Sequence, residues 1–340
     1  MKTYTYKDEP IRLYGLIGFE EDKRLTRLPD ELIERIPSLH HLGRRCPGAR
    51  MEFCTDATEI TVELEFKTLS VDVGMSLYHC QSAFVTVGEH TAAEYLGLVN
   101  PRDYTEKSVK KTFTLSGQMQ QVIIWLPRNE QMECVSVTVP DEAEVTAPHG
   151  YKYSTPILYY GSSITEGGCS CNIFNAYNAI ISRHLDADYY NLGFSGSAKG
   201  EPAMAEFIAK VDMSVFVYDY DHNAPTAKHL AETHEPFFKI IREARPELPI
   251  VMMTRPKVKY NDDEKRRREI VRATYERAVA SGDKNVYFLD GENFYGDTDR
   301  ELCSMDVIHP NDLGFYRMAE AIEPLINKLL ENGKGEKKNG

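Results

Sequence analysis

The sequence has few of the features that mark membrane, nucleic-acid-binding and disulfide-rich proteins. No apolar stretch approaches the ~20 residues that a membrane-spanning helix needs. The net charge of −12 disfavours nucleic acid or an anionic membrane as the main partner. The seven cysteines are odd in number and irregularly spaced, which indicates reduced thiols rather than a disulfide framework. Composition therefore favours a protein that acts on small molecules.

Three further features restrict the location, the cofactors and the binding sites that we expect. Residues 1–10 lack the apolar core of a signal peptide, so we expect a cytoplasmic protein. Cys169 and Cys171 form a Cys-x-Cys with no second pair, and we expect neither a metal nor another cofactor. The single tryptophan, Trp125, lies in an apolar run and is predicted to be a core residue rather than a platform for a sugar ring.

A chain of 340 residues exceeds what one hydrophobic core usually supports, so two domains are expected. Residues 1–150 show short alternating runs; Ile60, Val62 and Leu64 point one way and the polar residues between them point the other. Strands are predicted at 60–66, 83–87, 110–115, 121–126 and 135–139, with one helix at 29–36. Many short strands with little helix indicate a β-sandwich of the jelly-roll kind.

The second domain, residues 151–332, reads as α/β. Strands are predicted at 157–162, 187–193, 213–220, 249–254 and 285–290. Helices are predicted near 174–185, 202–210, 226–244, 262–281 and 312–331. Strands that alternate with helices predict a doubly wound parallel sheet. The polar, charged residues 333–340 are expected to be a disordered tail.

Ser163 is the first candidate for chemistry. It follows the apolar run 156–160 and the break Gly161-Ser162, and it precedes a helical pattern. A serine there projects into the crevice where open α/β sheets bind ligands, and the amides at a helix start can stabilise a developing negative charge. The same position also suits a helix N-cap. A nucleophile needs a base and an orienting acid elsewhere in the chain.

Asp306-x-x-His309 can supply both groups. At this spacing in a tight loop the aspartate carboxylate can reach Nδ1 of its own histidine. That contact fixes the tautomer and leaves Nε2 free to take a proton from a serine hydroxyl. Asn223, after the strand at 213–220, offers side-chain N–H donors, and the Gly-rich turn after the strand at 187–193 offers a backbone amide. Together with the Ser163 amide, these groups predict a three-donor oxyanion hole.

These blocks resemble the SGNH (GDSL-like) hydrolase superfamily over about residues 155–330. The matching pieces are Gly161-Ser162-Ser163-Ile164-Thr165, Asn191-Leu192-Gly193-Phe194-Ser195-Gly196, Asp221-His222-Asn223 and Asp306-Val307-Ile308-His309. The resemblance implies a flavodoxin-like sheet of strand order 2-1-3-4-5.

The resemblance also implies roles for individual residues. Ser163 would be the nucleophile, Gly196 and Asn223 oxyanion donors beside the Ser163 amide, His309 the base and Asp306 its partner. The chain departs from the family pattern twice. Ser162 stands where the Gly-Asp-Ser motif has aspartate, and Asp-His-Asn replaces the more familiar Gly-x-Asn-Asp.

Structural interpretations stand beside these functional ones. Gly193 is expected to serve its turn only, and Asn223 could form an Asx-turn. Asp221 and His222 are expected to support the site rather than bind a metal. Arg255, at the end of a strand, is a weak candidate for substrate contact, and a structural ion pair suits it equally well. The loop around 78–80 of the first domain could reach the cleft.

The predicted activity is hydrolysis of O-acyl esters through an acyl-enzyme on Ser163. A jelly-roll-like domain ahead of an SGNH domain resembles carbohydrate esterases that remove O-acetyl groups from polysaccharides or oligosaccharides. The same layout resembles acyltransferases and lysophospholipase-like esterases with longer acyl groups. A third alternative is a catalytically inactive carbohydrate-binding protein. The β-strands of the first domain offer surface that could pair subunits, and the sequence leaves the oligomeric state open.

Overall fold

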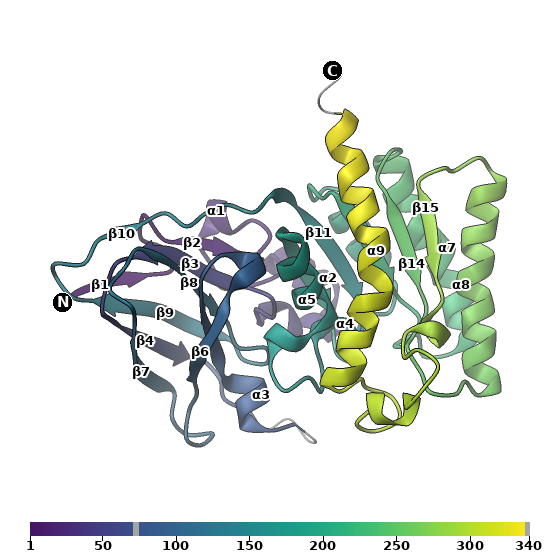
Figure 1. The fold of residues 1–340 in the computed structure, drawn as a ribbon. Coiled ribbons are helices and arrows are strands. Elements are labelled where there is room, and N and C mark those ends of the chain that lie inside the picture. Colours follow the sequence, from purple (N-terminus) through teal and green to yellow (C-terminus); the bar gives the residue numbers. More distant parts are fainter. Residues whose placement is uncertain (71–74, 337–340) are drawn as a thin grey trace.

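The computed structural model describes residues 1–70 and 75–336 of the chain. Two parts lie side by side, a β-rich N-terminal part and a C-terminal part in which helices cover a parallel sheet (Figure 1). The change from one part to the other falls between strand β10 (Val145–Thr146) and strand β11 (Tyr153–Gly161). The antiparallel strands precede this change and the strands of the parallel sheet follow it.

The N-terminal part is built from two antiparallel sheets. The first has the order β1 (Lys2–Thr5), β9 (Met132–Val139), β4 (Glu59–Phe66), β7 (Ser108–Thr114). The second has the order β10, β3 (Arg50–Thr55), β8 (Gln120–Trp125), β5 (Ala83–Val87), β6 (Glu94–Val99), and β2 (Arg12–Tyr14) pairs with β3. Inward-facing residues of both sheets form one core, in which the alternating apolar side chains of β4 are fully buried. This arrangement confirms the predicted β-sandwich.

The C-terminal sheet is parallel throughout and has the order β12 (Ala187–Gly193), β11, β13 (Val215–Asp219), β14 (Ile250–Met253), β15 (Val286–Leu289). In chain order this is 2-1-3-4-5, as the resemblance implied. The chain reverses direction across the sheet at β11, so the crevice at the carboxyl end of this strand is where such folds bind ligands.

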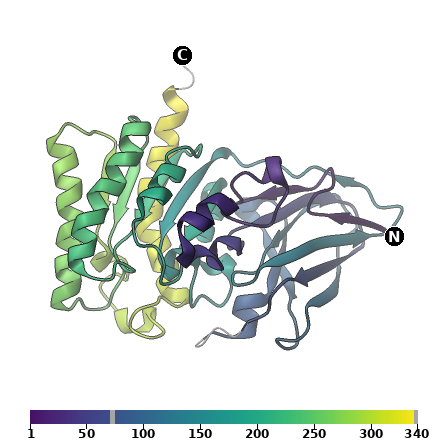
Figure 2. The same ribbon diagram turned by 180° about the vertical axis from the view of Figure 1, so that it is seen from behind.

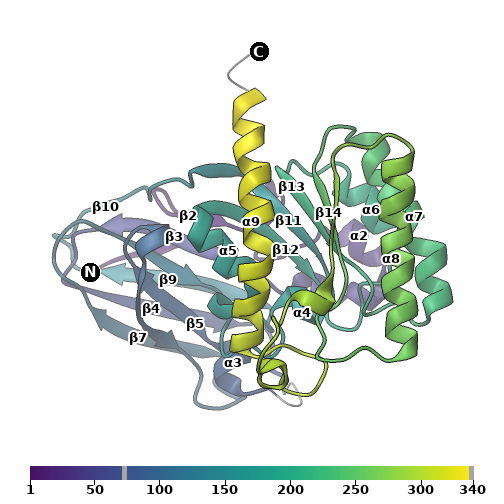
Figure 3. The same ribbon diagram turned by 45° about the vertical axis from the view of Figure 1, so that its right-hand side comes forward.

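Helices cover both faces of this sheet. Side chains of β11 alternate between the faces, so that Leu158 and Tyr160 pack with α6 (Pro202–Ile208), α7 (Ala227–Ala244) and α8 (Asp262–Ala280). Ile157 and Tyr159 pack on the other side with α5 (Tyr177–Leu185) and α9 (Asp312–Glu336). Figure 3 shows α9 running along this second face. The sheet is thus buried on both sides, which explains why its strands read as continuous apolar runs.

One N-terminal segment packs with the second domain. The predicted helix near 29–36 is α2 (Asp30–Arg35), and apolar residues within 28–39 belong to the same core cluster as β11 and α6. Figure 2 shows this segment, in purple, against the helical half of the molecule. Apolar residues within 28–39 therefore contribute to the core of the C-terminal part.

The end of the chain differs from expectation. The sequence predicts a disordered tail from residue 333, whereas α9 continues to Glu336. Residues 337–340 lie outside the described part. Within the described part of the chain, no helix has the length and apolar character needed to span a bilayer.

A buried polar cluster joins the two halves. Arg50 on β3 forms an ion pair with Asp188 on β12, and both side chains are buried. His90 lies between Glu52, 2.9 Å from Nε2, and Asp186, 2.7 Å from Nδ1. Burial lowers the pKa of His90, but the hydrogen bonds to Glu52 and Asp186 outweigh it and the net pKa is raised. His90 therefore bridges the two domains through a carboxylate on each side, Glu52 in one part and Asp186 in the other.

Trp125, the single tryptophan, is 1% exposed and meets the ring of Phe174 edge-on at 5.3 Å between centroids. Its indole nitrogen lies 3.4 Å from the hydroxyl of Thr86. The prediction of a core role for Trp125 is confirmed.

Candidate active site

The register of three parallel strands brings the predicted residues to one edge of the sheet. Gly161, the last residue of β11, pairs with Gly193 of β12 on one side and with Asp219 of β13 on the other. Ser163 follows β11 by two residues, and the segments that contain Gly196 and Asn223 follow the neighbouring strands within four. All three expected oxyanion segments therefore leave the sheet at its carboxyl edge.

Ser163, His309 and Asp306 form a hydrogen-bonded chain. The Oγ atom of Ser163 lies 2.8 Å from Nε2 of His309, and Nδ1 of His309 lies 2.8 Å from Oδ2 of Asp306. Each contact has ordinary hydrogen-bond length. Ser163 is 7% exposed, so its hydroxyl is close to the surface but shielded. The three side chains that the sequence analysis grouped therefore lie in the expected hydrogen-bonding order, Ser163–His309–Asp306.

The loop that carries Asp306 and His309 is shaped by its own backbone. Asp306 Oδ1 accepts the backbone N–H groups of Ile308 at 3.0 Å and His309 at 2.7 Å. Val307 adopts a φ of 64°, a left-handed conformation that is costly for a β-branched residue and is typical of functional loops. Burial raises the pKa of Asp306, but the hydrogen bonds from His309 and Ile308 outweigh it and the net pKa is lowered. Asp306 is thus held as a carboxylate facing the imidazole.

The N-cap alternative for Ser163 is resolved by its neighbour. Helix α4 (Ser163–Glu166) begins directly after β11, and the hydroxyl of Ser162 accepts the backbone N–H of Ile164 at 3.2 Å. Ser162 is therefore the N-cap, and the Ser163 hydroxyl is free to face His309. The capping role also explains how the position can dispense with the aspartate of the family motif, since serine and aspartate are both good N-caps.

Two glycines let α4 pack against the strand ends. A Cβ atom on Gly193 would lie 2.1 Å from the backbone nitrogen of Glu166, and one on Gly161 would lie 2.2 Å from the hydroxyl oxygen of Thr165. Gly193 therefore serves close packing, in line with its predicted structural role. Gly196 differs, because it has a φ of 67° and a Cβ there would meet open space.

The predicted oxyanion donors are not consumed by the fold. Within residues 1–70 and 75–336, no hydrogen bond is formed by the backbone N–H of Ser163 or Gly196, or by the Asn223 side-chain amide. The Asx-turn alternative for Asn223 is thus not realised in this part of the chain. All three groups therefore remain candidate donors to an anionic oxygen.

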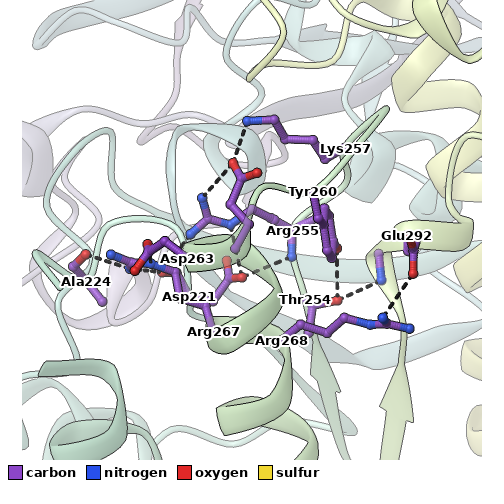
Figure 4. A network of polar contacts seen from close by, with 12 residues as sticks. Asp221, Ala224, Thr254, Arg255, Lys257, Tyr260, Asp263, Arg267, Arg268 and Glu292 are labelled. Carbon is purple, nitrogen blue, oxygen red and sulfur yellow. Dashed lines mark hydrogen bonds and ion pairs between the residues drawn. The ribbon is translucent and has the colours of Figure 1, made fainter. Parts of the chain in front are cut away.

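Arg255 lies in a buried ion-pair network beside the Asn223 segment (Figure 4). Its Nε atom is 3.1 Å from Asp221 Oδ2, and Nη2 donates to the Asp221 carbonyl at 3.1 Å. Nη1 faces Glu264 at 3.6 Å, and Arg255 is 7% exposed. Arg267 also donates to the carbonyls of Asp221 and Ala224. These contacts favour the structural alternative for Arg255, which fixes the backbone around Asn223.

His222 is a second histidine near the base. Its ring centroid is 6.5 Å from that of His309. Burial, with the nearby Arg255 charge, lowers the pKa of His222 to about 4, so this imidazole is neutral near neutral pH. It therefore adds no positive charge next to the expected base.

The sequence interpretation missed a buried charge cluster behind Ser163. Glu166, the last residue of α4, is fully buried and faces Arg27 and Arg128 of the N-terminal part. A carboxylate only three residues after Ser163 could have indicated a role for Glu166 near the site. No local sequence pattern pointed to the two arginines as its partners. The segment around 78–80, expected to be a loop, is instead the helix α3 (Leu77–Gln81), on which Tyr78 is 56% exposed.

The profile of the GDSL-like lipase/acylhydrolase family matches residues 154–327, just over half of the chain. The chain belongs to this family. The match covers the parallel sheet and every residue of the Ser163–His309–Asp306 chain. A search of curated protein sequences gives no match.

Solved structures with the same two-part layout share the fold at low sequence identity. A protein described as a GDSL-like lipase from Bacteroides ovatus has a TM-score of 0.87 at 22% identity, covering 97% of this chain and 98% of that chain. The salicylyl-acyltransferase SsfX3 from a tetracycline biosynthetic pathway has a TM-score of 0.77 at 21% identity, with coverage of 96% and 97%. A family two carbohydrate esterase from Cellvibrio japonicus has a TM-score of 0.64 at 14% identity, with coverage of 97% and 98%. The arrangement of both parts is therefore shared by proteins with different stated activities.

Proposed function

We propose that this GDSL-family protein is a serine esterase that cleaves O-acyl esters through an acyl-enzyme on Ser163. The observation that carries the proposal is the hydrogen-bonded chain from Ser163 Oγ through His309 to Asp306. Such a chain lets the imidazole take the serine proton while the carboxylate stabilises the imidazolium that forms. An inactive binding protein would have no use for this arrangement.

The reaction proceeds in two acyl-transfer steps. His309 Nε2 removes the proton from Ser163 as Oγ attacks the ester carbonyl, and the carbonyl oxygen becomes an oxyanion. The amides of Ser163 and Gly196 and the Asn223 side chain donate to it, and each such donor is worth about 3 kcal/mol. His309 then protonates the leaving alcohol, and a water activated by the same imidazole releases the acid.

The preferred substrate is an O-acetyl ester on a carbohydrate or oligosaccharide. Support comes from the shared two-part fold of family two carbohydrate esterases, one of which is described in complex with cellohexaose. Exposed large apolar side chains next to His309 favour a second candidate, an esterase or acyltransferase with longer acyl groups. Met305 is 50% exposed, Val307 70% and Ile308 36%, and an apolar surface beside the nucleophile favours longer acyl chains.

Ser163→Ala tests the central step. We expect it to abolish hydrolysis of p-nitrophenyl acetate and labelling by a fluorophosphonate, with an unchanged circular dichroism spectrum, because only the nucleophilic oxygen is removed. Undiminished turnover in this variant would refute the mechanism.

A substrate panel separates the two candidates. p-Nitrophenyl esters from acetate to octanoate, together with acetylated xylo- and manno-oligosaccharides, are compared by kcat/KM. The carbohydrate proposal expects acetyl esters and acetylated sugars to be preferred. Cleavage that rises with chain length and is absent on acetylated sugars would select the long-acyl candidate.

A further inference from the structure

Glu166 is a carboxylate buried directly behind the catalytic serine. It ends α4, the short helix that Ser163 begins, and its side chain is fully buried. Burial of a charged carboxylate is costly unless partners stabilise it. The proposed esterase mechanism gives Glu166 no chemical step, so its partners indicate what it does.

The first partner is the turn that carries Gly196. Glu166 Oε2 accepts the backbone N–H of Ser195 at 3.1 Å and also the Ser195 hydroxyl. The turn is closed by a hydrogen bond from Ser197 N to the Phe194 carbonyl at 3.0 Å, with Gly196 at its third position. At its start, Phe194 N donates to the carbonyl of Gly161 at 2.8 Å. Glu166 therefore fixes the residue that immediately precedes the expected oxyanion donor.

The second set of partners comes from the N-terminal part of the chain. Arg27 Nη2 lies 3.3 Å from Glu166 Oε1, and Arg128 Nη1 lies 3.7 Å from Oε2. Arg27 also donates to the carbonyl of Gly193 at 2.6 Å, at the end of the strand that leads into the turn. Burial raises the pKa of Glu166, but the charges of Arg128 and Arg27 outweigh it and hold the net pKa below its usual value. The carboxylate therefore stays ionised.

We propose that Glu166 is a positioning residue that links the serine helix to the oxyanion turn, and that the N-terminal domain completes the active site by supplying Arg27 and Arg128. One carboxylate fixes both Ser163, through α4, and the Gly196 amide, through Ser195. The inference rests on the proposed esterase function. It gives the N-terminal domain a role in catalysis that does not depend on carbohydrate binding.

The physical reason is that oxyanion stabilisation depends on donors held in place before charge develops. A displacement of about 1 Å in such a site can cost about 100-fold in rate. Loosening the turn should weaken binding of the oxyanion while leaving the ground-state ester almost unaffected. The expected signature is a fall in kcat at nearly constant KM.

Glu166→Gln is the main test, and Asp188→Asn is its matched control. Asp188 is likewise a buried carboxylate paired with an arginine of the N-terminal part, but it lies at the opposite end of β12. With p-nitrophenyl acetate we expect Glu166→Gln to lower kcat by about 10- to 100-fold with KM within about twofold. Asp188→Asn should lower the Tm and leave kcat within about twofold of wild type.

Ser195→Ala keeps the proposal testable if Glu166→Gln does not fold. It removes one donor to Glu166 and should lower kcat about 3- to 10-fold at an unchanged Tm. In a Glu166→Gln background that folds, the same change should have almost no further effect, because Ser195 acts through Glu166. The positioning role is overturned if Ser195→Ala has the kcat of wild type and Glu166→Gln, where it folds, does so too.

The wild type and Ser163→Ala are measured in the same series. Turnover that does not depend on Ser163 would overturn the esterase proposal and the role of Glu166 with it. Turnover that depends on Ser163 but is equal in wild type and Glu166→Gln would overturn the positioning role alone.

Discussion

Replacing Asp306 by asparagine should inactivate the enzyme by reversing the histidine tautomer. Asp306 Oδ1 accepts two backbone N–H groups, and Oδ2 faces His309 Nδ1 at 2.8 Å. An asparagine that keeps both backbone hydrogen bonds must point its NH₂ group at Nδ1, where two donors would meet. Flipping the amide instead loses both backbone hydrogen bonds, each worth about 0.5–1.5 kcal/mol at this partly exposed position. The first orientation is therefore favoured, and it moves the imidazole proton to Nε2.

The size of the expected loss in kcat follows from the loss of the base function of Nε2. Nε2 is the atom 2.8 Å from Ser163 Oγ, and a protonated Nε2 cannot act as base. In a fully buried serine-protease triad this change costs about 10⁴-fold in kcat. The Asp306 side chain is 37% exposed, so water can replace part of its effect. We expect a loss of about 10³-fold, or about 4 kcal/mol in activation free energy.

The assay is kcat for p-nitrophenyl acetate between pH 6 and pH 8, with Asp312→Asn as control. Asp312 lies in the same region and accepts Cys171 N at 2.7 Å without contacting His309. Its variant should stay within about twofold of wild type. Because the pKa of Asp306 is lowered in the fold, its contribution to stability is present above its unfolded pKa of about 4 and is lost only as pH falls through the folded value. An Asp306→Asn variant with more than a third of wild-type kcat would refute the tautomer argument.

Two further predictions concern packing and pH. Gly193→Ala should lower the free energy of unfolding by about 3 kcal/mol or more in urea denaturation and greatly reduce activity, because its Cβ would lie 2.1 Å from Glu166 N. Gly282→Ala, at a φ of 94° in open space, should cost only about 1–2 kcal/mol and spare activity; equal losses would count against the clash. The raised pKa of His90 means that its stabilising contribution is complete below its unfolded pKa of about 6.5 and is lost as pH rises through the folded value. The stability difference between wild type and His90→Gln should therefore shrink from pH 6 to pH 9, and a difference that grows with pH would contradict the charged bridge.

The elements that could be predicted are those with a strong local pattern. The five parallel strands and their helices were found within a few residues, because buried apolar runs and amphipathic helices repeat at fixed periods. In the first domain β4, β5, β7, β8 and β9 were found, but β1, β2, β3, β6 and β10 were not. β3 illustrates the reason. Its six residues are all buried, including Arg50 and Glu52, so charged residues in the interior interrupted the alternation that marks a strand.

The groups that carry the proposed chemistry could be predicted from local sequence. Ser163 and the Asp306-x-x-His309 segment were recognisable because each role needs a particular residue type at a strand end or at a fixed local spacing. Whether Ser162 or Ser163 capped the helix was decided only by the tertiary structure, since both serines suit the turn.

Only the tertiary structure could reveal the support behind the site. Glu166 and Arg27 are 139 residues apart in the chain, and neither lies in a pattern that points to the other. Their contact depends on the docking of the N-terminal part against β12, which is set by the packing of both domains together. A local motif can specify the groups that react, whereas the contacts that hold those groups in place depend on long-range packing that no local period encodes.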